Sequence, residues 1–368
     1  MNAVKPTKYI FVLGGVMSGL GKGITASSIG YLLKNAGVKV TILKLDPYLN
    51  VDPGTMNPYQ HGEVFVLDDG SETDLDLGHY ERFIDVNMTK NNNATAGQVY
   101  STVLERERKG EYLGQTVQVI PHVTDEIISR IKAVNQPKKY DVVICEVGGT
   151  VGDIESLPFM EAIRQLSLEM GYHNHLIVHV TLLPYVKASG ELKTKPTQHS
   201  VMKLREIGLS PDIIFCRSEY DIEQSVRNKI ALFCNVQPDH VIVGKDVPSI
   251  YEVPLVMHEQ NAGHLISERL KIQKESNLEA LKKFIHNFKN PSHEVTIAMC
   301  GKYTELIDSY KSVLESFIHA GVENNARVIV KWIQTEKIKD DEIAAFEFRD
   351  VDGILLLPGF GSRGGEGK

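Results

Sequence analysis

The sequence predicts an α/β fold: a P-loop-type, mostly parallel sheet with helices on both faces, followed by an incomplete second α/β domain. Buried parallel strands are continuous apolar runs, and segments with helical spacing separate such runs at 8–14, 38–46, 140–149 and 175–183. The first run leads into a glycine-rich turn and then a helix that ends near Gly37. A new apolar strand at 295–303 follows a charged stretch, which indicates that a second α/β unit begins there.

The chain divides by this pattern into three segments. We expect a first domain at 1–270, a linker with one amphipathic helix at 271–294 and a second domain at 295–368. Strands near 296, 327 and 354 are too few for a complete doubly wound domain, so this last segment is expected to be a fragment. Residues 47–80 form a stretch rich in Pro, Gly, Asp and Asn, and loops of that length are usually functional.

Composition excludes several classes of partner. The 368 residues carry a net charge of -7 and no run of lysine and arginine, so a nucleic acid or a membrane surface has no electrostatic support as a partner. No stretch approaches the roughly 18 consecutive apolar residues of a membrane helix. The cysteines lie far apart and form no metal-type pairs, which suits a reducing compartment, and we expect the cytoplasm: Cys145, Cys216, Cys234 and Cys300.

The segment GGVMSGLGKG at 14–23 differs from a standard phosphate-binding loop. Five residues separate Gly15 from Gly21, where the standard loop has four, and Gly23 stands where Ser or Thr would follow the lysine. The loop can still hold a triphosphate in its backbone N–H groups, with Lys22 neutralising the phosphates. The alternative is a tight strand-to-helix turn with an exposed lysine. Without that hydroxyl, magnesium ligands are expected further along the chain.

Carboxylates in two segments are candidates for those ligands. Asp74 and Asp76 alternate with leucines in ETDLDLGHYERF, so in an extended segment both would point the same way. Glu146 ends an apolar strand, and the carboxyl ends of parallel strands are where α/β sheets bind ligands. Mg²⁺ usually takes one or two carboxylates together with phosphate oxygens and water. The alternatives are a solvated turn for the aspartates and a capped strand end for Glu146.

Two further loops have compositions that suit nucleotides. Lys193 and Lys195 precede Pro196 and a helix expected from near Thr197, and lysines beside a helix N-terminus can hold a second polyphosphate, although charged loops are often only solvated. The segment GTVGDIES at 149–156 suits a ribose or base edge, or a helix N-cap, and both readings can hold at once. The histidines of HNHLIVHV have no carboxylate or cysteine beside them, so we do not expect zinc there.

Taken together, these segments resemble the CTP synthase family over nearly the whole chain. The similarity follows the family's order and spacing, and it rests on GGVMSGLGKG, KLDPYLNVDPGTMNPYQHGEVFVLDDGSETDLDLGHYERF, NNNATAGQVY, GEYLGQTVQVIPH, EVGGTVGDIESLPF, GELKTKPTQHS and ALFCNV. The resemblance implies an amidoligase that converts UTP to CTP with ATP and ammonia, the ammonia normally coming from glutamine in a class I glutaminase domain. It also implies CTP as a product inhibitor, GTP as an activator, and tetramers that can stack.

The resemblance also implies roles for individual residues. Lys22 and Lys44 would be catalytic phosphate contacts, and Asp76 and Glu146 would bind Mg²⁺, with Asp76 also at the ATP site. Residues that would otherwise hold ATP are Gly19, Leu20, Gly21, Gly23, Ile24, Lys245, Asp246 and Val247. Residues that would hold UTP or CTP are Ser18, Asp153, Ile154, Glu155, Lys193, Thr194, Lys195, Pro196, Thr197, Gln198 and Lys229.

His61 would lie beside the ammonia route, and Gly359 would lie in the oxyanion turn of the second domain, although its PGFG turn departs from the usual family pattern. Cys300 sits in an expected strand and is read as a core residue. No cysteine in the second segment therefore takes the nucleophile's place, and we expect these 368 residues to depend on ammonia. A rival hypothesis is a P-loop ATPase switch or scaffold without UTP chemistry.

Overall fold

The structure is a computed structural model of the 368-residue chain, and it describes residues 6–17, 19–56, 62–272, 275–301, 304 and 307–358. Contacts divide the chain into two compact units: one comprises Met1–Thr55 and Phe65–Leu278, the other Met56–Val64 and Glu279–Lys368. Within the described ranges, every helix is too short or too polar to cross a lipid bilayer.

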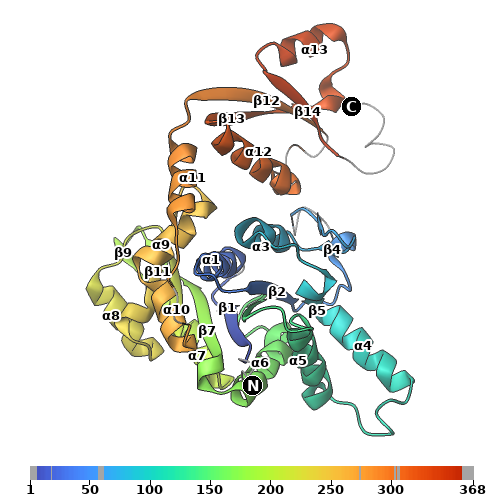
Figure 1. The fold of residues 1–368 in the computed structure, drawn as a ribbon, viewed down its shortest axis with the longest axis vertical. Helices are drawn as coiled ribbons and strands as arrows, with labels where there is room; N and C mark the ends of the chain where they lie inside the picture. Colours follow the sequence, from blue (N-terminus) through green and yellow to red (C-terminus); the bar gives the residue numbers. More distant parts are fainter. Residues whose placement is uncertain are drawn as a thin grey trace. The chain divides into compact units, whose positions relative to one another are not determined.

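The first unit is built on a parallel sheet of seven strands (Figure 1). Its spatial order is β11-β10-β7-β1-β6-β2-β5, and every neighbouring pair is parallel. The strands are β1 Lys8–Gly14, β2 Val40–Asp46, β5 Asn93–Thr95, β6 Val142–Val147, β7 His175–Leu182, β10 Ile213–Ser218 and β11 Val241–Lys245. After β1 the chain builds β2, β5 and β6 on one side and then β7, β10 and β11 on the other. This reversal creates the crevice at which α/β sheets bind ligands.

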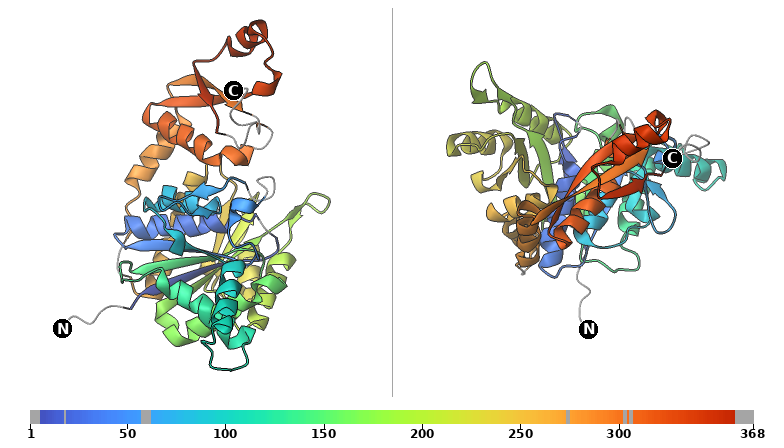
Figure 2. Two further views of the ribbon diagram at one scale, coloured as in Figure 1. Left: turned by 90° about the vertical axis from the view of Figure 1, so that its right-hand side faces the viewer. Right: turned by 90° about the horizontal axis from the view of Figure 1, so that it is seen from above.

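Helices cover both faces of this sheet, as Figure 2 shows in its left view. One face carries α1 Lys22–Asn35, α3 Asp76–Ile84, α9 Val253–Glu259 and α10 Ala262–Leu270. The other carries α4 Ala96–Arg108, α5 Thr124–Ala133, α6 Leu157–Met170, α7 Lys195–Glu206 and α8 Gln224–Cys234. The strands are buried on both sides, which explains their unbroken apolar runs. The predicted fold class is confirmed.

Local structure differs from expectation at two places. Asp74 and Asp76 were expected in one extended segment, but Asp76 begins helix α3 and the backbone N–H of Asp76 donates to Asp74 Oδ1 at 2.9 Å. The extended reading is therefore wrong, because the side chain and carbonyl of Asp74 accept from the N–H groups of Asp76 and Leu77 and so turn the chain into the helix. Helix α7 begins at Lys195 rather than near Thr197, since Pro196 fits the first turn of a helix.

The stretch 47–80 is not one long loop. It contains a 3-10 turn at Pro53–Thr55, a two-stranded hairpin of β3 Phe65–Val66 and β4 Glu72–Thr73, and the start of α3. A second small hairpin, β8 Tyr185–Val186 with β9 Glu191–Leu192, precedes α7.

The second unit contains a parallel sheet of three strands in the order β13-β12-β14. Its strands are β12 His293–Gly301, β13 Ala326–Gln334 and β14 Gly353–Leu356, and its helices are α11 Glu279–Lys289, α12 Lys311–Glu323 and α13 Asp341–Phe348. Cys300 is buried in β12, as expected of a core residue. Glu63 belongs to this unit and accepts a hydrogen bond from the N–H of Ser312 at 2.9 Å, which caps the first turn of α12.

Candidate functional site

Residues singled out in the sequence, together with others that were not, lie at the carboxyl ends of the first unit's strands. Gly14 ends β1, Asp46 ends β2 and Lys245 ends β11, while Glu146 is the penultimate residue of β6. Parallel strands present these ends on one edge of the sheet, so segments far apart in sequence meet there.

The glycine-rich turn forms a loop between β1 and α1. Gly19 and Gly21 have φ angles of 72° and 83°, a conformation that glycine adopts without strain, and α1 begins directly after Gly21. The loop's tip is exposed, whereas Leu20 and Lys22 are buried. The start of α1 therefore offers free backbone N–H groups to an anion.

Lys22 is not an exposed turn residue. Its side chain is 7% exposed, and Nζ donates to the carbonyl oxygen of Gly149 at 2.7 Å. Burial lowers the pKa of Lys22, an effect that the Glu146 carboxylate opposes. The exposed-lysine alternative is therefore wrong, and Lys22 joins the phosphate loop to the segment after β6.

A buried charge cluster surrounds Lys44. Its Nζ contacts Asp76 Oδ2 in a short hydrogen bond, donates to Glu146 Oε2 at 2.8 Å and lies 3.8 Å from Asp46 Oδ1. Burial opposes the charge on Lys44, but the carboxylates outweigh it and hold its pKa well above the ordinary value. The pKa of Asp76 is lowered because Lys44 outweighs the effect of burial. The solvated-turn and strand-cap alternatives for Asp76 and Glu146 are wrong.

Gly23 explains the departure from the standard phosphate loop. A Cβ on Gly23 would overlap Oδ1 of Asp76 and would stand 2.7 Å from its Cγ. The Asp76 carboxylate thus lies against the helix position at which the standard loop has its metal-binding hydroxyl. A carboxylate from α3 thus occupies the space beside this position of α1.

Mg²⁺ fits this donor set. Among the described residues, no three His, Cys, Asp or Glu side chains are grouped so as to hold a metal by themselves. Two carboxylates that share one cationic neighbour, next to a phosphate loop, match the usual magnesium site, which is completed by phosphate oxygens and water. Asp76 and Glu146 are therefore chemically suited to the ion.

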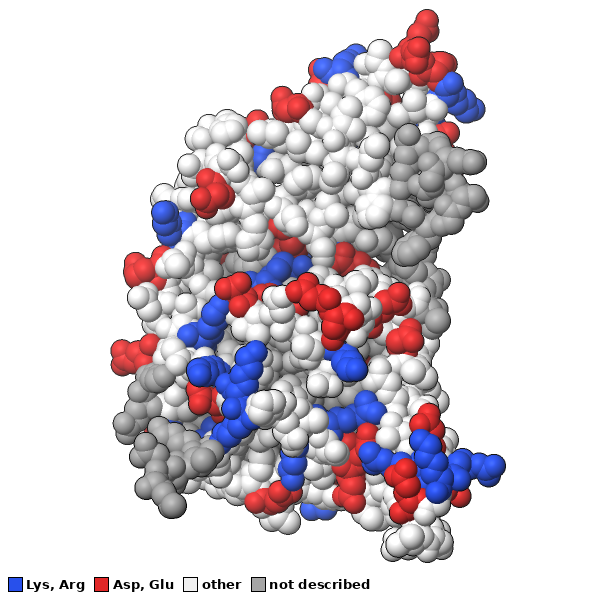
Figure 3. Space-filling model, turned by 45° about the vertical axis from the view of Figure 1, so that its right-hand side comes forward, with Lys and Arg blue, Asp and Glu red and all other residues white. Residues whose placement is uncertain are grey.

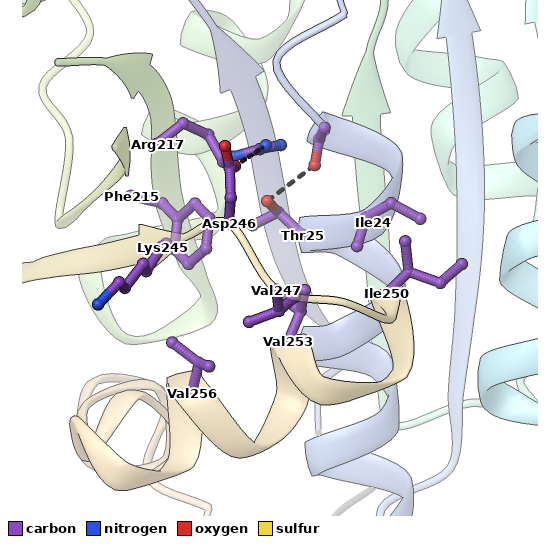
Figure 4. Close-up of a pocket in the computed structure, with 12 residues that line it drawn as sticks. Ile24, Thr25, Phe215, Arg217, Lys245, Asp246, Val247, Ile250, Val253 and Val256 are labelled. Atoms are coloured by element: carbon purple, nitrogen blue, oxygen red, sulfur yellow. Dashed lines mark hydrogen bonds and ion pairs between the residues drawn. The ribbon is translucent and has the colours of Figure 1, made fainter. Parts of the chain in front are cut away.

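A cavity of about 290 Å³ opens beside the loop (Figure 4). Apolar groups from Ile24, Phe215, Val247, Ile250, Val253 and Val256 line it. Gly21, Thr25, Arg217, Gly244, Lys245 and Asp246 complete its wall. A cavity with this apolar lining, next to a phosphate loop, suits a flat apolar ring of a bound molecule.

Arg217 joins two walls of that cavity. Its guanidinium donates to the carbonyl oxygen of Leu20 at 3.3 Å and to Asp246 Oδ1 at 2.5 Å, an ion pair drawn in Figure 4. Lys245 points elsewhere and pairs with Asp221 at 2.7 Å. The predicted residues Gly21, Ile24 and Lys245–Val247 are thus brought together around one space.

The segment at 193–198 lies at the N-terminus of α7. Lys193 forms a short ion pair with Glu191, and the charge of Lys229 on α8 also acts on Glu191, so Lys193 and Lys229 lie in one electrostatic neighbourhood. Thr194 and Thr197 are buried, Pro196 and Gln198 are half-buried, and Lys195 is exposed. Thr197 Oγ donates to the carbonyl oxygen of Leu182 at 3.1 Å, so its side chain anchors α7 to β7.

The segment Asp153, Ile154 and Glu155 is exposed before α6. Asp153 Oδ2 accepts from the N–H of Thr150 at 2.9 Å, which closes the loop upstream of it, and it makes no side-chain bond to the helical turn that follows. Asp153 nonetheless occupies the N-cap position of the 3-10 turn at Ile154–Ser156, with exposed Glu155 in its first turn, so the N-cap reading holds by position but not through a side-chain bond. Ser18, His61 and Gly359 lie outside the described residues.

Three site residues were not expected from the sequence. Arg217 and Asp46 stand at strand ends, the same signal that pointed to Glu146. Tyr80 is fully buried and donates a short hydrogen bond to Glu146 Oε2, and its helical position gave no signal of this. On the face shown in Figure 3, basic and acidic side chains are interspersed.

Comparison with known proteins adds independent information. Residues 8–272 match the family described as CTP synthase N-terminus, and residues 305–368 match the glutamine amidotransferase class-I family. The CTP synthase of Clostridium acetobutylicum is 58% identical over 363 residues, which are 98% of this chain and 68% of that protein. The CTP synthase of Methanocaldococcus jannaschii is 54% identical over 371 residues, covering 99% and 68%. The chain thus spans about two thirds of these relatives.

Among solved structures, the septum site-determining protein MinD of Pyrococcus horikoshii, complexed with Mg-ADP, matches with a TM-score of 0.35 and 16% identity. That match covers 72% of this chain and 93% of the other, and at that score we draw nothing from it.

Proposed function

Because the chain belongs to the CTP synthase family, whose activity is the conversion of UTP to CTP, we propose that its first unit aminates UTP in two steps. In the first step, the uracil O4 takes the γ-phosphoryl group of ATP, which leaves ADP and a 4-phosphorylated UTP. In the second, ammonia attacks C4 and phosphate departs, so that UTP, ATP and NH₃ yield CTP, ADP and phosphate. Phosphorylation is needed because the carbonyl oxygen is a poor leaving group.

One observation carries this proposal: the buried cluster of Lys44, Asp76 and Glu146 lies against the start of α1. The loop around Gly21 binds the ATP phosphates through backbone N–H groups, and Lys22 moves from the Gly149 carbonyl to the transferring phosphate. Lys44 stays protonated because its pKa is raised, and it stabilises the charge that develops. Mg²⁺, held by Asp76 and Glu146, supplies charge neutralisation on the phosphates when bound.

The cavity beside the loop takes the adenine. Phe215, Val247 and Val256 provide apolar contact, and Gly244 leaves space for the Phe215 side chain, from which a Cβ would stand 2.5 Å. On the other side of the loop, the start of α7 with Lys193 and Lys195 binds the triphosphate of UTP. Two triphosphates then meet head to head over one loop, which accounts for lysines from several segments.

Ammonia is the nitrogen source that we propose for these 368 residues. All four cysteines are buried and free, and burial raises the pKa of the thiol of Cys300 in the second unit. A buried thiol of raised pKa is a poor nucleophile, so glutamine hydrolysis at Cys300 is disfavoured. The proposal extends, by resemblance, to CTP as inhibitor, GTP as activator, a homotetramer and the cytoplasm.

The test is CTP formation by the purified chain with UTP, ATP, Mg²⁺ and ammonium chloride. We expect ADP production to depend on UTP and CTP to rise with pH as the NH₃ fraction grows. The rival ATPase switch predicts ADP production that does not depend on UTP. No CTP under any ammonium concentration would refute the amination proposal.

A further inference from the structure

His179 lies beneath the phosphate loop in a position that the reaction just proposed does not use. It is on β7, its side chain is 0% exposed, and Nε2 lies 2.7 Å from Ser200 Oγ on α7. Burial, with the charge of Lys22 as a further cause, lowers the pKa of His179 to about 4, so the ring is neutral at pH 7.

The Nδ1 atom of His179 has no hydrogen-bond partner within the described part of the chain. An unpaired acceptor costs less in a protein interior than an unpaired N–H. This favours the tautomer in which Nε2 carries the proton and donates to Ser200. His179 on β7 is then the donor of this hydrogen bond and Ser200 on α7 is the acceptor.

The phosphate loop rests directly on this pair. A Cβ on Gly15 would overlap Ser200 Oγ and would stand 3.0 Å from His179 Nε2, so only glycine fits at this point. The N–H of Gly15 donates to the carbonyl oxygen of Val180 at 3.0 Å, which fixes the loop to the same strand. The phosphate loop, strand β7 and helix α7 thus come together at Gly15, His179 and Ser200.

The same helix turn is anchored a second time. Thr197, one turn before Ser200, bonds to Leu182 and to Thr181, both on β7. The face of α7 at positions 197 and 200 is therefore bound to the sheet, while Lys195 is the first residue of the helix and Lys193 precedes it. His179 determines how closely the start of α7 approaches the loop.

We propose that His179 is a positioning residue, which through Ser200 fixes the UTP-binding start of α7 against Gly15 of the ATP-binding loop. This inference rests on the proposed function. In-line transfer from ATP to UTP needs the two nucleotides at a set separation, and a displacement of about 1 Å can cost on the order of 100-fold in rate. Loss of the contact should impair transfer more than binding.

The test uses four variants of the whole chain. His179→Ala removes the bond, Ser200→Ala removes it from the other side, and His179→Gln keeps a donor with the reach of Nε2. The matched control is His175→Gln at the opposite end of the same strand, where the ring contacts only the Gly171 carbonyl among its hydrogen-bond partners in the described residues. For each we would measure kcat, the KM of each nucleotide, the ratio of ADP to CTP formed, and the midpoint of thermal unfolding.

We expect His179→Ala and Ser200→Ala to lower kcat for CTP at least about tenfold, with the KM values changed less than about threefold. The ratio of ADP to CTP should rise above one, because ATP that is misaligned with UTP loses its phosphate to water. His179→Gln should restore most of kcat, and His175→Gln should match the wild type.

If both alanine variants kept the wild-type kcat and the wild-type ratio of ADP to CTP, the inference would be overturned. So would equal losses of ADP and CTP that follow the unfolding midpoint, since these indicate a merely structural role. Absence of CTP from the wild-type protein would overturn the proposed function, and this inference with it.

Discussion

The carboxylate of Asp76 lies in the space that a side chain on Gly23 would occupy. The two residues belong to the first turns of α1 and α3, so the carboxylate lies where the standard phosphate loop has its hydroxyl. Asp76 also contacts Lys44, so a shift of one group moves the whole cluster.

Gly23→Ala is therefore expected to lower magnesium-dependent CTP formation strongly, by about 100-fold, because the added methyl displaces Asp76 from the phosphate loop. Titration of activity against Mg²⁺ should show a higher requirement as well as a lower maximum. The matched control is Gly263→Ala in α10, where a Cβ meets nothing closer than 3.8 Å. Normal magnesium dependence in Gly23→Ala would refute this account of the loop.

Glu146→Gln and Asp76→Asn should each lose activity that high Mg²⁺ cannot restore, since each keeps the side chain's size and removes an anionic ligand. Glu146 is 1% exposed and accepts from both Lys44 and Tyr80, so its neutral form also leaves Lys44 with fewer partners. We would follow CTP formation and circular dichroism together. Retained Mg²⁺ use would place the metal elsewhere.

Lys22→Ala should reduce CTP formation by about 100-fold or more, because the lost charge stabilises the transferring phosphoryl group. The fold should persist, since Lys22 forms one hydrogen bond, to Gly149, among the described residues. Lys34→Ala on the same helix is the control, as its exposed pair with Asp85 lies at the other end of α1. Near-normal CTP production in Lys22→Ala would contradict the assignment.

Glu155→Ala should weaken inhibition by CTP more than it raises the KM of UTP, because we expect the exposed segment at Asp153–Glu155 to contact the base and ribose by which CTP and UTP are told apart. Inhibition constants and KM values on one preparation would decide it. Glu169→Ala, which removes an exposed carboxylate paired with Lys132 at the other end of α6, should change neither. Equal changes in the inhibition constant of CTP and the KM of UTP would show that this segment does not discriminate between the two nucleotides.

Stability should fall as the pH is lowered from 6.5 towards 4. The pKa of His179 is lowered from 6.5 to about 4 in the folded chain, so the unfolded chain binds the proton more readily across this window. The free energy of unfolding is therefore unaffected by protonation of His179 above pH 6.5. It falls as the pH drops from 6.5 towards 4, by a maximum of about 3 kcal/mol.

Denaturant midpoints at pH 7 and pH 5 would measure this. His179→Gln should show a smaller drop between the two pH values than the wild type, whereas His264→Gln, at an exposed position on α10, should leave the drop unchanged. An identical drop in wild type and His179→Gln would show that other groups cause it.

The sequence by itself determined the fold class and most of the site's members. Parallel strands buried on both faces require unbroken apolar runs, and the carboxyl end of one such run pointed to Glu146, whereas Lys245 was implied by the family resemblance. The glycine-rich turn and the missing hydroxyl after Lys22 indicated carboxylates elsewhere, a local argument that needs no coordinates.

Only the tertiary structure decided which of these residues meet. Asp76 begins α3 and its N–H donates to Asp74, whereas its contact with Gly23 depends on how α3 packs against α1. The family resemblance implied a phosphate contact for Lys44, but only the structure shows that three carboxylates surround its charge. His179 was set aside with its neighbours as part of a strand, because the partner that gives it a role, Ser200, lies on another element. Such pairings depend on long-range packing, which local patterns of polarity and spacing do not encode.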